Sequence, residues 1–278
     1  MAAATLARAM QWSGPSHMMQ APNTALAVRT SDPRAEQRLS SLVSIQSGSG
    51  TPFFCVHGSG GNVLNFRDLA SRLGSSQSFY GLQAPGVDGS AAVASVEELA
   101  EQYIGELLQV RPQGPYLLGG YSSGGIIAFE MARRLHAAGF QTLLVLLDTF
   151  APGVAPRGPS LGEHVNRLMA QGPRYLAHRA REKLNRQSDS LHLALKIRFY
   201  QHQGAPLPYE LREHQLNQAA LAAAARYKPA PHHGPSILYR AAHTDDCFRH
   251  IGPQRGWNQL LPNLRIFEVA GNHTNFIQ

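Results

Sequence analysis

The chain has 278 residues, of which 43% are hydrophobic, so it is long enough for one large domain or two small ones with a buried core. Its formal net charge is +7, yet only 15% of the residues are charged and no dense Lys/Arg cluster appears, so we do not expect it to bind nucleic acid. Two cysteines are too few for a disulfide framework, and no apolar run approaches the ~20 residues of a membrane span, so we expect a cytoplasmic protein without a membrane partner.

Residues 1–40 show no sustained hydrophobic period and are rich in Ala, Ser, Pro and Met. The first acidic residue is Asp32, and with Arg8 and Arg29 the stretch faintly resembles an organellar transit peptide. Two arginines over the first thirty residues are few for that role. We therefore interpret residues 1–40 as a flexible leader or linker.

From residue 41 onward, apolar runs bounded by turn residues alternate with apolar residues spaced by three and four. The first pattern predicts strands and the second predicts helices. The predicted strands are residues 41–46, 53–58, 78–84, 115–120, 141–148, 235–241 and 263–271. The predicted helices among them are residues 65–74, 95–112 and 125–139. Helix 95–112 has the clearest start, because Ser95 followed by Glu98 predicts a capping box.

Strands that alternate with helices indicate βαβ units, hence a mostly parallel sheet with helices on both faces. The alternation is interrupted between about residues 152 and 228, where two helical patterns, 160–187 and 211–227, follow each other with no strand between them. A helical insertion of this kind is typical of a lid over a site. We therefore expect one α/β domain over 41–278 that carries a helical lid.

The stretch YLLGGYSSGG, residues 116–125, contains two motifs that share Ser122. Leu-Gly-Gly-x-Ser resembles the site where a carrier protein takes a phosphopantetheine arm. Gly-x-Ser-x-Gly is the nucleophile elbow of the α/β-hydrolase fold, a strained turn from strand to helix. The elbow needs small residues two before and two after its serine. Gly120 and Gly124 meet this demand around Ser122, whereas Tyr121 stands two residues before Ser123.

The context of the motif distinguishes the two interpretations. A carrier site heads a helix in a small, all-helical module, whereas here a predicted strand runs directly into the motif and a predicted helix follows it. We therefore interpret Ser122 as a nucleophile and reject the carrier site.

A serine nucleophile needs a histidine base, which in this fold follows the serine and the acid in the chain. His273 comes directly after the last predicted strand, so its loop should open at the same sheet edge as the elbow. The other candidates are placed less well. His57 precedes the serine in the chain. His232 and His233 precede a strand, and His243 and His250 follow an earlier strand.

The base needs an acid to orient it. Asp148 ends the most apolar predicted strand, TLLVLLD, and a carboxylate at the tip of a buried strand faces the site crevice. Asp245 and Asp246 follow a later strand and are the alternatives.

Backbone amides must also stabilise the oxyanion that forms during acyl transfer. One donor should be the N–H of Ser123, the residue after the nucleophile. The other should come from the glycine-rich loop HGSGG at 57–61, where we favour the N–H of Ser59. Gly58 and Gly60 are close alternatives, and a simple glycine turn without this role is a further one.

Several segments together carry a family resemblance. They resemble the thioesterase domains at the ends of nonribosomal peptide synthetases and polyketide synthases, and the thioesterase of animal fatty acid synthase. The segments are FFCVHGSGGNVLNFRDLASRL, FYGLQAPGVDG, YIGELLQVRPQGPYLLGGYSSGGIIAFEMARRL, LLDTFAP, ARYKPAPHHGPSILYRA and VAGNHTNF. The resemblance covers about 41–278, is specific at the elbow and at GLQAPG, and is loose through the lid.

The resemblance implies the α/β-hydrolase fold and a triad of Ser122, Asp148 and His273. The interval from serine to acid matches the family and favours Asp148 over Asp245. Many relatives have Gly-Asp-His where this chain has Gly-Asn272-His, a departure from which we expect little effect. Relatives usually continue into a closing helix, whereas this chain stops five residues after His273. Both an excised terminal domain and a stand-alone enzyme fit these features.

The expected activity is release of an acyl, peptidyl or polyketide chain from a carrier-bound phosphopantetheine thioester, by hydrolysis or cyclisation. An acyl carrier or peptidyl carrier protein is the expected partner, and no cofactor or metal is expected. An esterase or lipase acting on oxygen esters is one alternative, and a catalytically inactive binding module is another. Residues 163–200 contain eight Lys or Arg residues and three acidic residues. This excess of positive charge is consistent with docking of an acidic carrier or with a solvent-exposed helix surface.

Overall fold

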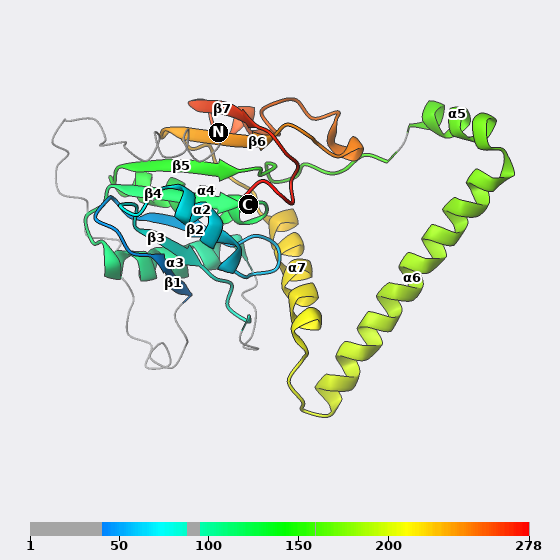
Figure 1. Ribbon diagram of the computed structural model, residues 1–278, viewed down its shortest axis with the longest axis horizontal. Coiled ribbons are helices and arrows are strands. Elements are labelled where there is room, and N and C mark those ends of the chain that lie inside the picture. The colour runs from blue at the N-terminus through cyan, green and yellow to red at the C-terminus, as the bar shows by residue number, and fades with distance from the viewer. Residues whose placement is uncertain (1–40, 88–94, 159, 278) are drawn as a thin grey trace.

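The computed structural model describes residues 41–87, 95–158 and 160–277. The predicted leader at 1–40 lies outside these ranges. Seven strands form one sheet in the order β1-β3-β2-β4-β5-β6-β7 (Figure 1). They are β1 (Leu42–Gln46), β2 (Phe53–Val56), β3 (Phe79–Leu82), β4 (Tyr116–Tyr121), β5 (Thr142–Leu147), β6 (Ser236–Ala241) and β7 (Leu264–Val269). Only β1 runs antiparallel to its neighbour; the other pairs are parallel, as predicted.

Helices cover both faces of this sheet. The helical elements are η3 (Leu64–Phe66), α2 (Arg67–Arg72), α3 (Val96–Val110), α4 (Gly124–Ala137), α5 (Leu161–Gln171), α6 (Pro173–His202), α7 (Tyr209–Arg226), η4 (Asp246–Phe248) and η5 (Trp257–Gln259). The predicted fold class, an α/β-hydrolase sheet with helices on both sides, is confirmed.

Alternate residues of the buried strands supply two hydrophobic cores. Phe54 and Leu118 point to the core that the sheet shares with α3 and α4. Phe53 and Leu117 point to the opposite core, which α2 closes. Since successive side chains of a strand face opposite sides, a strand covered on both faces reads as a continuous apolar run, which explains segments such as FFCV and TLLVLL.

The strand order places β2 next to β4, with β3 on the far side of β2 and β5 on the far side of β4. The chain therefore leaves the ends of β2 and β4 in opposite directions. A crevice forms where such connections diverge, outside the carboxyl ends of the strands. The loop at 57–61 and Ser122 both lie at this point.

One of the two hydrogen bonds of the capping box predicted at the start of helix 95–112 is present. The Ser95 side chain accepts a hydrogen bond from the Glu98 amide at 3.2 Å, but no return bond from the Glu98 side chain is recorded among the described residues. A complete capping box occurs instead at the start of α5, between Ser160 and Glu163. This second capping box was not predicted from the sequence.

The insertion between β5 and β6 contains three helices, where two helical segments were predicted. The segment predicted at 160–187 is divided at Gly172, which adopts φ 61°, a left-handed value that glycine tolerates. Pro173 then begins α6, where its missing N–H costs nothing. Figure 1 shows α6 leading away from the body, with α5 at its far end. The chain returns to the body in α7, which packs against α3.

None of the helices in the described ranges combines the length and apolar composition needed to cross a membrane.

The end of α7 is tied to α4 by a buried carboxylate. Glu130 of α4 is 1% exposed and accepts hydrogen bonds from Arg133, from Arg134 and, at 2.6 Å, from the hydroxyl of Tyr227, the residue after α7. Burial raises the pKa of Glu130, but these hydrogen bonds outweigh burial and hold the pKa below its ordinary value.

Glu130→Gln is expected to lower the free energy of unfolding at pH 7 by about 1–3 kcal/mol, because it weakens four hydrogen bonds from three residues to a buried charge. Since the folded state lowers the pKa of Glu130, this stabilisation is present above the ordinary value of 4.5 and is lost as the pH falls below it. The difference between wild type and variant, measured by urea unfolding, should therefore shrink from about pH 7 to about pH 3.5.

Glu101→Gln is the matched control, because Glu101 is 78% exposed and meets Arg134 at 3.5 Å on the surface. It should change stability by less than ~0.5 kcal/mol. A Glu130→Gln effect that stayed constant across this pH range would contradict the assigned ionisation.

Candidate active site

Ser122 sits on a sharp turn between β4 and α4 with φ 54°, a strained value for a residue other than glycine. A Cβ at Gly120 would lie 2.4 Å from the Gly124 carbonyl oxygen, and one at Gly124 would lie 1.9 Å from the His57 carbonyl oxygen. Both glycines are therefore required by backbone contacts. Gly125 is also constrained, since its Cβ would lie 2.2 Å from Oγ1 of Thr149, a requirement that the motif did not reveal.

The structure brings Ser122, Asp148 and His273 together at the carboxyl edge of the sheet. Nε2 of His273 lies 3.0 Å from Oγ of Ser122, and Nδ1 of His273 lies 2.7 Å from Oδ2 of Asp148. The register of β4 and β5 explains why Ser122 and Asp148 are close. Tyr121 of β4 pairs with Leu147 of β5, and Ser122 and Asp148 are the residues that follow this pair. This arrangement can transfer the serine proton to the imidazole while the carboxylate holds the ring.

Asp148 is 2% exposed, so its charge needs partners. Its Oδ1 accepts hydrogen bonds from the Ala241 amide at 2.8 Å and from a guanidinium nitrogen of Arg255 at 2.9 Å. Burial raises the pKa of Asp148, but the hydrogen bonds from His273 and Ala241 and the charge of Arg255 outweigh burial, so the pKa lies below its usual value. The carboxylate is therefore ionised at neutral pH and available to orient His273.

Arg255 is a residue of this site that the sequence analysis missed. It is 3% exposed, adopts φ 52°, and lies over the ring of Phe150 at 4.3 Å. Its carbonyl oxygen accepts a hydrogen bond from the Ala151 amide. These contacts hold the guanidinium against Oδ1 of Asp148, on the opposite side of the carboxylate from His273, so Arg255 can fix the direction in which Asp148 points.

Arg255→Met is expected to lower kcat by about 10–100-fold, because an unrestrained Asp148 misplaces the imidazole by a fraction of an ångström to an ångström. Loss of the Arg255 charge also removes one of the causes that lower the pKa of Asp148, so the fall in activity at acidic pH should begin at a higher pH. Arg255→Lys should restore most of the profile. If kcat and Tm both fall while the pH–rate profile stays unchanged, Arg255 has only a structural role.

Tyr121 is a second missed contact. Its ring stacks on the His273 ring with centroids 5.1 Å apart, and its hydroxyl donates a hydrogen bond to the His273 carbonyl oxygen. Burial, assisted by the charge of Asp148, raises the pKa of Tyr121 to about 12, so the phenol remains a donor. Tyr121 therefore holds the loop that carries His273 against the elbow.

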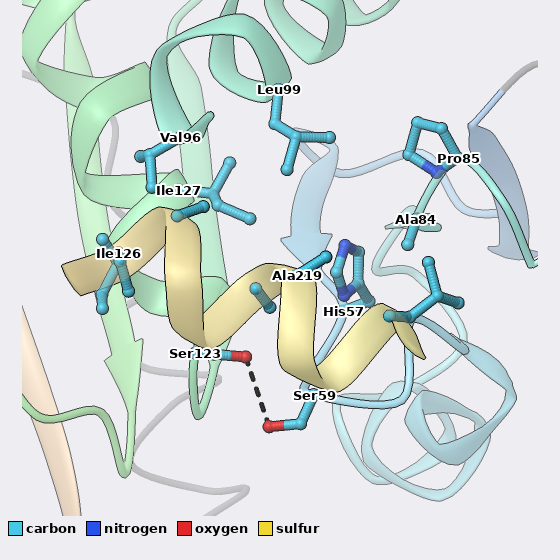
Figure 2. Close-up of a pocket in the computed structure, with 14 residues that line it drawn as sticks. His57, Ser59, Ala84, Pro85, Val96, Leu99, Ser123, Ile126, Ile127 and Ala219 are labelled. Atoms are coloured by element: carbon cyan, nitrogen blue, oxygen red, sulfur yellow. Dashed lines mark hydrogen bonds between the residues drawn. The ribbon is translucent and has the colours of Figure 1, made fainter. Parts of the chain in front are cut away.

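The two predicted oxyanion donors belong to neighbouring loops. Oγ of Ser59 and Oγ of Ser123 lie 3.4 Å apart, which ties the loop at 57–61 to the elbow (Figure 2). Within the described part of the chain, neither the Ser59 amide nor the Ser123 amide has a recorded partner. The amides of Gly58 and Gly60 share this property, so these two remain alternatives to Ser59.

The alternative acids and bases have other surroundings. His57 is buried, with Nε2 3.1 Å from the hydroxyl of Tyr103, and burial lowers its pKa to about 4. His232 is buried against Phe129. Asp246 pairs with Arg249 on the surface. Across the described residues, the recorded side-chain partner of Ser122 is His273.

The described residues contain no cluster of three or more His, Cys, Asp or Glu side chains that could hold a metal ion.

A parallel sheet with an elbow serine that meets a histidine at its carboxyl edge defines a serine hydrolase of the α/β-hydrolase type. The model of the family described as "Thioesterase domain" matches residues 51–195, just over half of the chain. The chain therefore belongs to the thioesterase domain family, and the resemblance found in the sequence is confirmed.

Three curated relatives are synthetases or synthases that are much longer than this chain. Atromentin synthetase nps3 of Serpula lacrymans var. lacrymans (strain S7.9) is 36% identical over 124 residues, which are 44% of this chain and 13% of the relative. Malpinin synthetase of Mortierella alpina is 44% identical over 104 residues, 37% of this chain and 1% of the relative. Indigoidine synthase of Streptomyces lavendulae is 34% identical over 125 residues, 44% of this chain and 10% of the relative. The chain thus spans only a small part of these relatives.

Solved structures agree on the fold. A four-domain nonribosomal peptide synthetase, holo-AB3403 bound to AMP and glycine, has a TM-score of 0.65 at 26% identity and covers 86% of this chain and 19% of that one. The NocB thioesterase domain in covalent complex with a fluorophosphonate nocardicin G analogue has a TM-score of 0.60 at 24% identity, with coverages of 85% and 92%. YbtT, a type II thioesterase, has a TM-score of 0.57 at 19% identity, with coverages of 86% and 93%.

Proposed function

We propose that this thioesterase releases an acyl, peptidyl or polyketide chain from the phosphopantetheine thioester of a carrier protein. The chain passes through an acyl-enzyme on Ser122 and leaves by hydrolysis or by cyclisation. The observation that carries the proposal is the hydrogen-bonded series from Ser122 through His273 to buried Asp148, formed at a strained elbow.

In the first step, Nε2 of His273 takes the proton of the Ser122 hydroxyl while Oγ bonds to the thioester carbon. The carbonyl oxygen becomes an oxyanion, which the amides of Ser59 and Ser123 receive. The carbon–sulfur bond then breaks, and the pantetheine sulfur leaves with the proton from His273. Asp148 stabilises the imidazolium during this transfer.

In the second step, a water molecule gives a proton to His273 and attacks the acyl carbon. The bond to Oγ breaks, Ser122 regains its proton and the free acid leaves. An amine or hydroxyl of the acyl chain can replace the water, in which case the product is cyclic.

A comparison of matched thioester and oxygen-ester substrates tests the activity. The same acyl group presented as a pantetheine thioester and as an ethyl ester should give a much larger kcat/KM for the thioester. A preference for the oxygen ester would instead support an esterase or lipase.

The second candidate is an inactive binding module, and the geometry of Ser122 disfavours it. Wild-type protein should react with a fluorophosphonate at Ser122. Failure of this labelling in folded protein would support the binding module.

A carrier protein is the proposed partner, because the curated relatives are synthetases. The proposed docking surface is the basic arm, defined as α5 and α6, which Figure 1 shows leading away from the body. Six of its described cations are exposed: Arg167, Arg174, Arg179, Arg181, Lys196 and Arg198. The exposed acids described there are Glu163 and Asp189. Such an excess would attract an acidic carrier and steer its approach.

Reversing Arg179 and Arg181 to glutamate is expected to raise KM for a carrier-bound substrate roughly tenfold at low ionic strength, through slower association. KM for a small pantetheine thioester should be unchanged. The charge-matched control reverses Arg67 and Arg72, which are exposed on α2. Equal effects on both substrates, or equal effects of the two double variants, would contradict docking on the basic arm.

A further inference from the structure

A pocket lies under α7, beside the loops that carry the proposed oxyanion donors. Figure 2 shows Ser59 and Ser123 at its lower edge and Val96 and Leu99 at its upper edge, with α7 crossing it. Ile126 and Ile127 of α4 line it as well. The pocket therefore borders the two serines whose amides are the proposed oxyanion donors, and its apolar lining extends away from them.

The wall formed by α7 consists of small residues. Its lining positions follow the spacing of one helix face and are Leu216, Ala219, Ala220, Ala223 and Ala224. On the outer face Leu221 is 54% exposed. A helix that packed only for stability would bury its larger side chains, because apolar area removed from water stabilises and unfilled space destabilises. The alanines instead leave space between α7 and α4.

None of the described residues that line the pocket carries a charged side chain. Its polar side chains are the hydroxyls of Ser59 and Ser123 and the ring of His57. Burial lowers the pKa of His57 to about 4, despite a hydrogen bond to the Gly58 carbonyl that opposes this, so the ring is neutral at pH 7. A charged group placed here would lose its hydration without gaining a partner.

We propose that this pocket binds an uncharged aliphatic segment of the acyl group, and that the alanine face of α7 sets its width. The inference rests on the proposed function, because it places the acyl carbonyl oxygen at the amides of Ser59 and Ser123. From that point the carbon chain runs under α7, toward Ile127 and Leu99. Charged acyl chains are excluded by the apolar lining.

The test measures kcat/KM for acetyl, hexanoyl, octanoyl and adipyl pantetheine thioesters. Hexanoyl and adipyl groups have the same number of carbons, but the adipyl group ends in a carboxylate. Wild type should favour hexanoyl over acetyl and over adipyl by roughly tenfold or more. Ala220→Leu should lower the hexanoyl-to-acetyl ratio about tenfold, because it fills the pocket. Leu216→Ala, which removes a lining side chain, should shift the preference toward octanoyl, and it keeps the test decisive if Ala220→Leu does not fold.

Ala222→Leu is the matched control, because Ala222 is exposed and points away from the pocket on the same helix. It should leave the ratio unchanged. Turnover by wild type with the same ratio in Ala220→Leu and Ala222→Leu, or an adipyl rate equal to the hexanoyl rate, would overturn the pocket while leaving the proposed function intact. Wild type that turned over none of the thioesters and resisted the fluorophosphonate would overturn both.

Discussion

Ser122→Ala is expected to lower kcat for thioester release by about 10⁴-fold or more, because it removes the atom that receives the acyl group. Residual turnover would come from the oxyanion donors alone. The variant should also lose all labelling by a fluorophosphonate. Stopped assays with a chromogenic thiol reagent would measure release, and intact-protein mass spectrometry would measure labelling.

Ser123→Ala is the matched control for this prediction. Ser123 is the adjacent serine, and its proposed contribution is a backbone amide that alanine retains. Its kcat should stay within about tenfold of wild type. Normal turnover in Ser122→Ala, or a larger loss in Ser123→Ala, would contradict the assignment of the nucleophile.

Asp148→Asn is expected to lower kcat by about 10³–10⁴-fold, because an amide cannot stabilise the imidazolium and favours the wrong ring tautomer. Asparagine keeps the shape of the side chain, but it leaves the buried charge of Arg255 without its anion. We therefore expect a lower Tm as well, since an unpaired buried charge costs about 3–5 kcal/mol. Activity must be measured well below the Tm of the variant.

Asp245→Asn supplies the comparison for the acid. Asp245 precedes η4 and was, with Asp246, one of two rival candidates, because both follow the strand predicted at 235–241. Its replacement should leave kcat within a few-fold of wild type. A large loss in Asp245→Asn with a small loss in Asp148→Asn would transfer the role of the acid to Asp245.

The strands, the elbow and the proposed triad could be predicted because each follows from a pattern of neighbouring residues. Strands buried on both faces appear as apolar runs, and each was located to within two residues at either end. The elbow could be predicted because the turn requires small residues two before and two after the serine, and Gly120 and Gly124 stand at these positions. His273 and Asp148 were proposed because they follow strand ends, and parallel strands bring their carboxyl ends to one edge.

The parts that were missed depend on contacts between segments distant in the sequence. Arg255 lies 107 positions from Asp148, and only the fold of the chain after β6 brings its guanidinium to the carboxylate. Tyr121 was noted only as a bulky residue beside the elbow, since its stack on His273 joins positions 152 apart. The helix at 211–227 was predicted, but its alanine face was not identified, because its meaning depends on the position of α4.

The division of the insertion was missed for a different reason. Gly172 and Pro173 are the two residues that punctuate helices most strongly, and they stand in the middle of the segment predicted as one helix. The hydrophobic period is clear in α5 but weak in α6, so the pattern after Gly172 did not show that a new helix begins there. Of the insertion's three helices, α7 is the one that lines the pocket.

Peptide mapping of the protein trapped during turnover tests the central claim most directly. Wild type mixed with hexanoyl pantetheine thioester and quenched with acid should carry one hexanoyl group on the peptide that contains Ser122. The adduct should be absent from Ser122→Ala and should disappear from wild type as the free acid appears. Steady release of hexanoic acid with no adduct at Ser122, or with an adduct on another residue, would contradict the account.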